Sequence, residues 1–101
     1  MRQWAYEIVY RTMEQKQYSD RLFHKIVKKK GDFSAQEKRF LKRLSYGTIE
    51  RCVELDAILA HFSKVPVRKM TPSVRTVLRM GLYEMRFMDQ IPGAVSCNVA
   101  V

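Results

Sequence analysis

Apolar residues return every three or four positions along almost the whole chain, and no stretch alternates apolar and polar residues with a period of two. A repeat of about 3.6 residues is typical of amphipathic α-helices, whereas strands show the shorter period. Helical patterns cover residues 3–15, 19–30, 34–62 and 72–89, and a last one begins at Pro92. The stretch 34–62 is long enough for two helices, which divide at Gly47 or near Arg51. The pattern therefore predicts one all-α domain over residues 1–101, a bundle of about six helices with the last helix truncated.

Residues at three predicted helix ends match capping signals. The basic run Lys28–Lys30 precedes Gly31, so cations would meet the negative end of the helix dipole and glycine would take the left-handed cap. The stretch Ser34–Glu37 reads SAQE, which is a capping box. Thr71 precedes Pro72, which is an N-cap residue followed by proline in the first turn. These signals favour helices that begin and end at these points.

The pattern in residues 72–89 predicts the most fully packed helix face of the chain. Its members are Val74, Val77, Leu78, Gly81, Leu82, Met85 and Met88. Glycine costs a helix about 1 kcal/mol relative to alanine, so a close crossing of two backbones at Gly81 is the predicted compensation. Aromatic side chains are expected to fill the space between helices, namely Trp4, Phe40, Phe62 and Phe87.

Positive charge dominates the composition. The chain has 19 Lys and Arg against 10 Asp and Glu, a net charge of +9. Residues 16–43 hold ten of the basic residues and three acidic ones, a local balance of 10 − 3 = +7. A surplus of this size on a small domain suggests an anionic partner, with nucleic acid first. The positions suited to phosphate contacts lie on adjoining helical stripes, at Lys38, Arg39, Lys42 and Arg43.

A second group of cations lies within residues 72–89, on the predicted helix with the packed apolar face. Arg75, Arg79 and Arg86 are four and seven residues apart, which places them within roughly 40° of one another around a helix. The stripe fits RNA phosphates, and it equally fits ion pairs that cover the edge of the core. For Arg79 the ion pair is the preferred interpretation, and Asp56 is expected to hold an arginine of this helix or to cap a turn.

The residues needed for catalysis or metal binding are not grouped in this sequence. Cys52 and Cys97 are far apart and form no CxxC motif, which indicates reduced thiols and a cytoplasmic protein. No pair of the four glycines is spaced for a dinucleotide-binding loop. His24 and His61 have no further ligand at metal-binding spacing and are expected at the surface. The sequence therefore predicts no catalytic residue, no metal and no bound cofactor in this chain.

Three stretches of the sequence resemble a known family. YGTIERCVELDAIL, VRTVLRMGLYEMRFMDQIP and AVSCNVAV are similar, in this order, to the NusB-like fold, shared by the antitermination factor NusB and the N-terminal domain of RsmB-type 16S rRNA cytosine-5 methyltransferases. The run Tyr46–Thr48, the pair Leu55–Asp56 and LRMGLYEM are closer to the methyltransferase branch. The sequence departs from both branches at Val99, where glutamate is usual after the residue matched by Asn98.

The resemblance implies an RNA-binding helical bundle. For the methyltransferase branch it also implies a longer parent chain, whose catalytic domain uses S-adenosylmethionine. Arg2 matches the basic first helix that the family turns toward RNA, although this helix carries only Arg2 and Arg11 here. Aromatic candidates for stacking on unpaired bases are Tyr10, Tyr18 and Tyr83, although an amphipathic boundary residue is the preferred interpretation of each.

Three functions follow as hypotheses. The first is an accessory domain that helps a methyltransferase hold 16S rRNA, with the catalytic domain in cis. The second is an antitermination factor that binds RNA together with a ribosomal protein. The third is a protein-interaction or homodimerisation module whose charge serves only solubility, and that module would expose an apolar patch.

Overall fold

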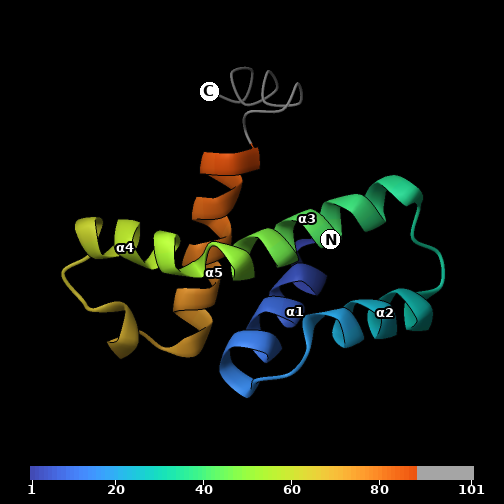
Figure 1. Ribbon diagram of the computed structural model, residues 1–101, viewed down its shortest axis with the longest axis horizontal. Helices are drawn as coiled ribbons and strands as arrows, with labels where there is room; N and C mark the ends of the chain where they lie inside the picture. Colours follow the sequence, from blue (N-terminus) through green and yellow to red (C-terminus); the bar gives the residue numbers. More distant parts are fainter. Residues whose placement is uncertain (89–101) are drawn as a thin grey trace.

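The computed structural model describes residues 1–88, and these residues fold entirely into helices and connecting turns (Figure 1). The all-α prediction is confirmed. In order, the elements are α1 (Arg2–Gln15), α2 (Ser19–Lys30), α3 (Ala35–Glu50), α4 (Cys52–Phe62), the 3₁₀-helix η1 (Val67–Lys69), α5 (Pro72–Tyr83) and the π-helical turn η2 (Glu84–Met88). The break between α3 and α4 falls at Arg51. The helix predicted from Pro92 lies outside the described residues.

The predicted helix-end signals are present as contacts. Gly31 takes the left-handed conformation with φ 79°, and its N–H donates to the Val27 carbonyl at 2.9 Å. The Ser34 N–H donates to the Glu37 carboxylate at 2.9 Å, and the Glu37 N–H donates to the Ser34 hydroxyl at 3.1 Å. The Thr71 hydroxyl accepts from the backbone of α5 at 3.3 Å. Short-range sequence signals therefore set where these helices begin and end.

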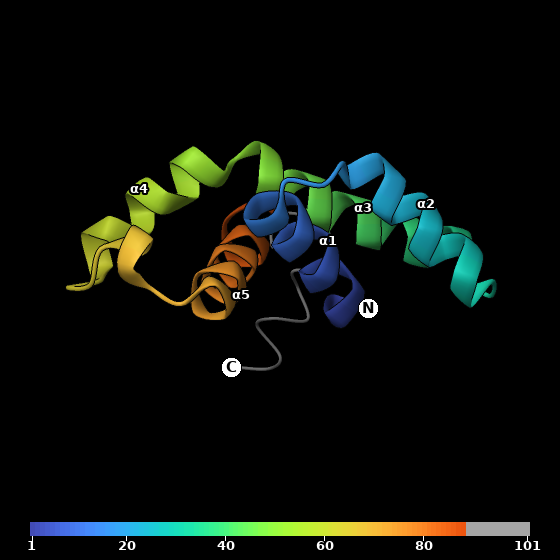
Figure 2. The same cartoon turned by 90° about the horizontal axis from the view of Figure 1, so that it is seen from below.

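Helix α1 lies at the centre of the fold and packs against α2, α3 and α5. Figures 1 and 2 show α2 and α3 side by side in one half of the molecule, with α4 extending into the other half. The core is built from Ala5, Ile8, Val9, Leu22, Phe23, Ile26, Phe33, Leu41, Leu44, Leu55, Met80, Tyr83 and Met88.

Three of the four predicted aromatic fillers pack against this core. Trp4, Phe40 and Phe87 are partly buried beside it. Phe62 is 82% exposed, so that prediction was wrong. The reason is its position, because Phe62 is the last residue of α4, at the outer end of this helix, where no other helix of the described part covers it (Figure 1).

Helix α5 packs through a different face from the predicted one. Its buried residues are Thr76, Arg79, Met80 and Tyr83. On the predicted face, Met88 is buried and Leu82 is partly buried, but exposed side chains occupy Val74, Val77, Leu78 and Met85. The prediction failed because two polar residues fit the core. The Thr76 hydroxyl donates to the Pro72 carbonyl at 2.7 Å, and Arg79 pairs with Asp56.

The close helix approach occurs at Gly47 of α3 and not at Gly81, as the sequence pattern had predicted. A Cβ atom built on Gly47 would overlap the hydroxyl group and ring of Tyr83. A Cβ on Gly81 would meet no atom within 4 Å. Gly81 lies on the exposed side of α5, so its neighbours impose no need for glycine.

Candidate nucleic-acid interface

The side chain of Arg75 points into the protein. Its guanidinium donates to the two carboxylate oxygens of Glu14 on α1, at 2.7 and 2.5 Å. It also donates to the carbonyls of Arg68 and Met70 at 3.3 and 3.4 Å. Both side chains are largely covered, at 19% exposed for Arg75 and 14% for Glu14. These contacts tie α5 to α1 and to the preceding loop.

Arg79 is more deeply buried. Its guanidinium donates to both carboxylate oxygens of Asp56 on α4, at 2.7 and 2.8 Å, and its side chain is 8% exposed. The expectation that Asp56 holds an arginine of this helix is confirmed. Spacing alone had left ion pairs and RNA contacts open for the stripe, and two of its members form ion pairs between helices.

The remaining predicted arginines near the chain ends are exposed. Arg86 lies in η2 on the surface. Arg2 is exposed but engaged, because its guanidinium donates to Glu84 at 2.7 and 2.8 Å and lies 5.7 Å from the centre of the Phe40 ring. The Glu84 pair keeps the pKa of Arg2 above its usual value, through the hydrogen bond first and the charge second. Because the Glu84 carboxylate offsets the charge of its guanidinium, Arg2 offers less positive charge to RNA than the sequence suggested.

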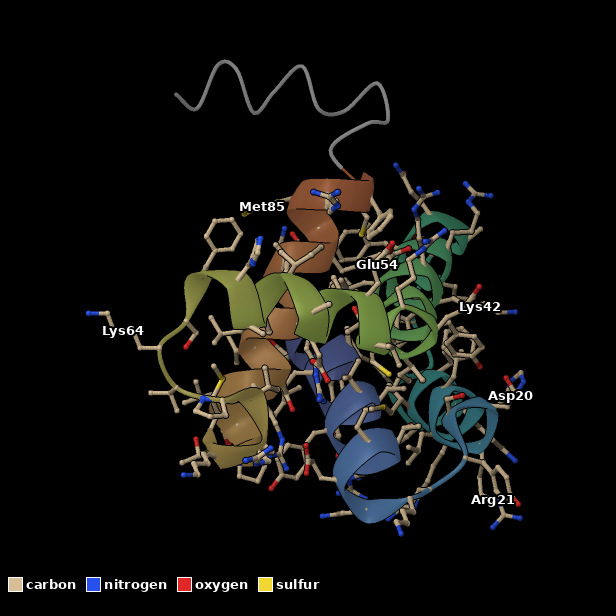
Figure 3. The ribbon with its side chains drawn as sticks, turned by 60° about the vertical axis from the view of Figure 1, so that its left-hand side comes forward. Asp20, Arg21, Lys42, Glu54, Lys64 and Met85 are labelled. Atoms are coloured by element: carbon tan, nitrogen blue, oxygen red, sulfur yellow. The ribbon has the colours of Figure 1, made fainter. Side chains whose placement is uncertain are left out.

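Helix α3 presents three exposed cations of the predicted set that form no ion pair among residues 1–88. Lys38, Arg39 and Lys42 are all exposed, and we call these three residues the α3 basic patch. Figure 3 shows Lys42 projecting away from the fold, on the side opposite Lys64. Arg43 is exposed too, but it donates to the Phe87 carbonyl at 3.2 Å and so also joins α3 to η2. Helix α3 lies beside α2 (Figure 1), and the local positive balance of residues 16–43 spans both helices.

The ammonium group of Lys42 lies 5.5 Å from the centre of the Tyr46 ring. Tyr46 donates to Asp20 at 2.5 Å. Burial first, and then the hydrogen bond and charge of Asp20, raise the pKa of Tyr46 well above its usual value. The phenol therefore stays neutral and fixes the ring beside the α3 basic patch.

The three tyrosines proposed for base stacking occupy different environments. Tyr18 is 79% exposed, immediately before α2. Tyr10 is partly buried and stacks on Tyr6 with 5.6 Å between ring centres. Tyr83 is buried at 6% exposure, so its proposed position at the surface was wrong. It faces Gly47, and no base can reach its ring.

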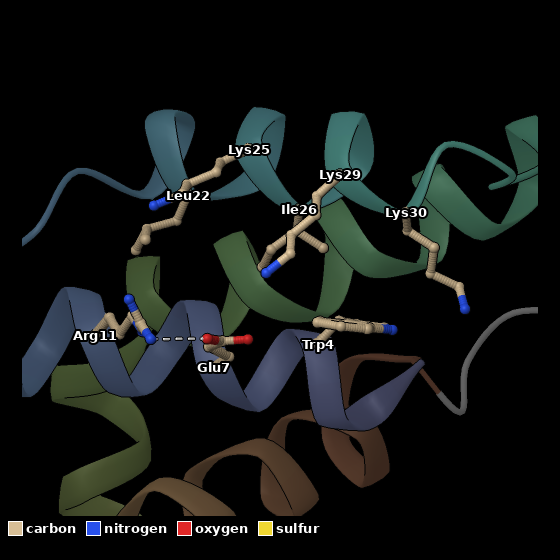
Figure 4. Close-up of a pocket in the computed structure, with 8 residues that line it drawn as sticks. All are labelled: Trp4, Glu7, Arg11, Leu22, Lys25, Ile26, Lys29 and Lys30. Atoms are coloured by element: carbon tan, nitrogen blue, oxygen red, sulfur yellow. Dashed lines mark ion pairs between the residues drawn. The ribbon is translucent and has the colours of Figure 1, made fainter.

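Sequence reasoning missed a pocket between α1 and α2 (Figure 4). It is lined by Trp4, Glu7, Arg11, Leu22, Lys25, Ile26, Lys29 and Lys30. Lys29 and Lys30 had been explained by helix-end electrostatics and Trp4 by core packing, so the sequence analysis did not place them at one pocket. The available signal was the spacing in α2, because its lysines share a stripe with its apolar residues.

The sequence predicts no catalytic residue and no metal site, and the structure can be compared with this prediction over residues 1–88. Within that range, no three His, Cys, Asp or Glu side chains are grouped to hold a metal ion. Cys52 is partly buried, and His24 and His61 are exposed. Over the same range, no helix has the length and apolar character needed to span a bilayer.

The ion pair between Glu14 and Arg75 is expected to make the free energy of unfolding depend on pH. The hydrogen bond from Arg75 holds the pKa of Glu14 below its usual value, against the opposing effect of burial. Because the folded-state pKa is lowered, the pair stabilises the fold fully above the unfolded-state pKa of about 4.3, and this contribution disappears as the pH falls through the folded-state value. We expect Glu14→Gln to lower the unfolding free energy by about 1–2 kcal/mol at pH 7 and to have little effect near pH 3.

Urea unfolding at the two pH values measures this difference. Glu7→Gln is the matched control, since Glu7 pairs with Arg11 at 3.0 Å within one helix and both side chains are more exposed, at 36% and 41%. Such pairs contribute only about 0.3–0.5 kcal/mol. An equal loss in both variants, or a loss at Glu14 that persists at pH 3, would contradict the assignment.

Comparison with known proteins identifies relatives of two kinds. The profile of the NusB family matches residues 1–101. The "Probable ribosomal RNA small subunit methyltransferase B" of Synechocystis sp. is 29% identical over 100 residues, which is 99% of this chain and 22% of the relative. The protein with the same name from Bacillus subtilis is 35% identical over 88% of this chain and 20% of the relative. "Transcription antitermination protein NusB" of Geobacillus kaustophilus is 36% identical over 61% of this chain and 48% of the relative.

The chain thus spans about a fifth of the length of the methyltransferases that it matches. No solved structure gives a significant match.

Proposed function

The chain belongs to the NusB family, and on this premise we propose that it is the RNA-binding accessory domain of a 16S rRNA cytosine-5 methyltransferase. Two findings support the methyltransferase branch. The methyltransferase relatives match 99% and 88% of the chain, whereas the NusB relatives from Geobacillus kaustophilus and Halalkalibacterium halodurans match 61% and 81%. The sequence motifs around Tyr46–Thr48 and Leu55–Asp56 also favour that branch.

The observation that carries the RNA-binding proposal is the α3 basic patch. Its three cations are exposed on one helix, while Arg75 and Arg79 are occupied in ion pairs. Exposed cations on adjoining turns bind phosphates by charge and contribute affinity without selecting a sequence. Arg43, which contacts η2, and Arg86, which lies in η2, are expected to extend this surface.

In this proposal, methyl transfer belongs to a catalytic domain of the parent protein. That domain would bind S-adenosylmethionine and contain the reactive residues. The present domain would increase the residence time of the RNA substrate on the protein. The parent protein would act on rRNA in the cytoplasm. No residue among those described is assigned to catalysis.

A triple substitution tests the proposal. We expect Lys38→Ala/Arg39→Ala/Lys42→Ala to raise the Kd for a 16S rRNA fragment by roughly 10- to 100-fold at low salt, because three phosphate contacts are lost. Fluorescence anisotropy of the labelled RNA measures the Kd.

The matched control removes the same charges elsewhere. Lys64→Ala/Arg68→Ala/Lys69→Ala also deletes two lysines and one arginine, all exposed, from the end of the molecule beyond α4. We expect its Kd to stay within about threefold of the unmodified chain. Equal weakening in both variants would mean that net charge, and not the α3 basic patch, determines binding.

The exposed apolar face of α5 favours a second candidate, a protein-contact role. Val77 on α5 is 56% exposed, and Met85 in the following η2 is 66% exposed. Association through apolar surface does not weaken as salt increases, so the salt dependence of binding separates this candidate from RNA recognition.

A further inference from the structure

The pocket between α1 and α2 has an apolar floor with a flat aromatic ring. Its volume is about 360 Å³, within the roughly 300–1,000 Å³ typical of small-ligand pockets. Leu22 and Ile26 are buried on the α2 side, and the partly buried Trp4 lines the pocket from α1. A flat apolar surface of this kind suits a planar ring.

The rim of the pocket is cationic. Lys25 and Lys29 stand four residues apart on α2 and are exposed, and among residues 1–88 neither forms an ion pair. Like charges at this spacing slightly weaken a helix. The single carboxylate of the lining, Glu7, is paired with Arg11 at 3.0 Å. The lining therefore retains positive charge that no neighbouring carboxylate neutralises.

The side chains of the rim do not all point the same way. Figure 4 shows Lys29 reaching down between Glu7 and Trp4, whereas Lys30 points toward the outer end of the pocket. The Lys30 ammonium lies 6.0 Å from the centre of the Phe33 ring. Lys29 is therefore the cation beside Trp4, whereas Lys25 points toward the Arg11 end of the pocket (Figure 4), so an anion attached to a ring on Trp4 would extend along the pocket from Lys29 toward Lys25.

We propose that this pocket binds a nucleotide, with the base stacked on Trp4 and the phosphate held by Lys25 and Lys29. Stacking on aromatic rings combined with cationic contact to the phosphate is the general chemistry of single-stranded nucleic-acid recognition. The nucleotide comes from unpaired RNA or from free solution. The RNA source rests on the proposed function, and the free nucleotide does not.

Trp4 is the single tryptophan of the chain, so its fluorescence reports directly on the pocket. A short single-stranded oligoadenylate and adenosine monophosphate are titrated separately into the 101-residue chain, with excitation at the red edge of tryptophan absorption. Both should quench Trp4 to saturation, and the oligonucleotide should act at lower concentration if RNA is the source. Lys25→Ala/Lys29→Ala should raise the concentration for half-maximal quenching by about tenfold or more.

Lys64→Ala/Lys69→Ala removes the same charge far from the pocket and should titrate like the unmodified chain. Anisotropy of the labelled oligonucleotide separates the two proposals. RNA binding without quenching of Trp4, or equal effects of the two double variants, would overturn the nucleotide pocket and leave the RNA-binding proposal standing. Quenching by adenosine monophosphate in a chain that binds no RNA would support the pocket with free nucleotide as its ligand and refute the RNA-binding proposal.

Discussion

Replacing Gly47 by alanine is expected to destabilise the fold by about 2 kcal/mol, while the same change at Gly81 should stabilise it by up to about 1 kcal/mol. The new methyl group at position 47 would overlap the hydroxyl group and ring of Tyr83, which is buried at 6% exposure. Overpacking of this kind costs about 1–3 kcal/mol and occasionally more, and the gain in helix propensity offsets about 1 kcal/mol of it. Gly81 has no atom within 4 Å of the added group, so only the propensity gain remains.

Urea unfolding followed by circular dichroism measures both free energies. Because a change of 1 kcal/mol shifts the Tm of a domain of this size by roughly 4–8 °C, the two variants should melt more than 10 °C apart. A Gly47→Ala variant as stable as Gly81→Ala would show that α3 and α5 do not approach as closely as the structure describes.

Removing the carboxylate of Asp56 is the second change with a large expected effect. Asp56→Ala leaves the guanidinium of Arg79 buried at 8% side-chain exposure without its partner. Breaking a buried ion pair costs about 3–5 kcal/mol. Asp56 itself is 32% exposed, so water screens part of the interaction, and we expect a loss of about 2–3 kcal/mol.

The double variant Asp56→Ala/Arg79→Met distinguishes a lost ion pair from lost packing. Methionine fills most of the arginine volume without a buried charge, so the double variant should regain stability relative to Asp56→Ala. Its RNA affinity should match that of the unmodified chain, because Arg79 faces α4 and not solvent. A double variant less stable than the single variant would contradict this account.

Local sequence signals predicted the helices and their ends well. The capping box at Ser34, the left-handed Gly31 and the Thr71 cap depend on contacts within a few residues, which the sequence displays directly. The pairing of Asp56 with an arginine of the long helix was also predictable. Spacing placed Arg75 and Arg79 on one stripe, but it could not say that Glu14 would approach Arg75 from α1.

The predicted packed face of α5 and the predicted role of Gly81 were wrong for one reason. Hydrophobic patterning assigns residues to the core by residue type alone. Helix α5 has apolar residues on more than one side, and the stripe that faces the core includes Thr76 and Arg79. Both satisfy their polar groups locally or through Asp56, so a polar stripe could be buried. For the same reason the glycine inside the apolar pattern was chosen over Gly47, whose role depends on where Tyr83 lies in three dimensions. The pocket at Trp4 likewise depends on how α1 meets α2.

The salt dependence of RNA binding tests the central claim most directly. The Kd of the chain for a single-stranded 16S rRNA fragment is measured by fluorescence anisotropy over a series of salt concentrations. With three phosphates held by the α3 basic patch, the logarithm of the association constant should fall with the logarithm of salt concentration with a slope of about −2. The slope should become shallower by about 2 in Lys38→Ala/Arg39→Ala/Lys42→Ala. Absent binding, or binding that does not change with salt, would contradict RNA recognition and favour the protein-contact role of the exposed face of α5.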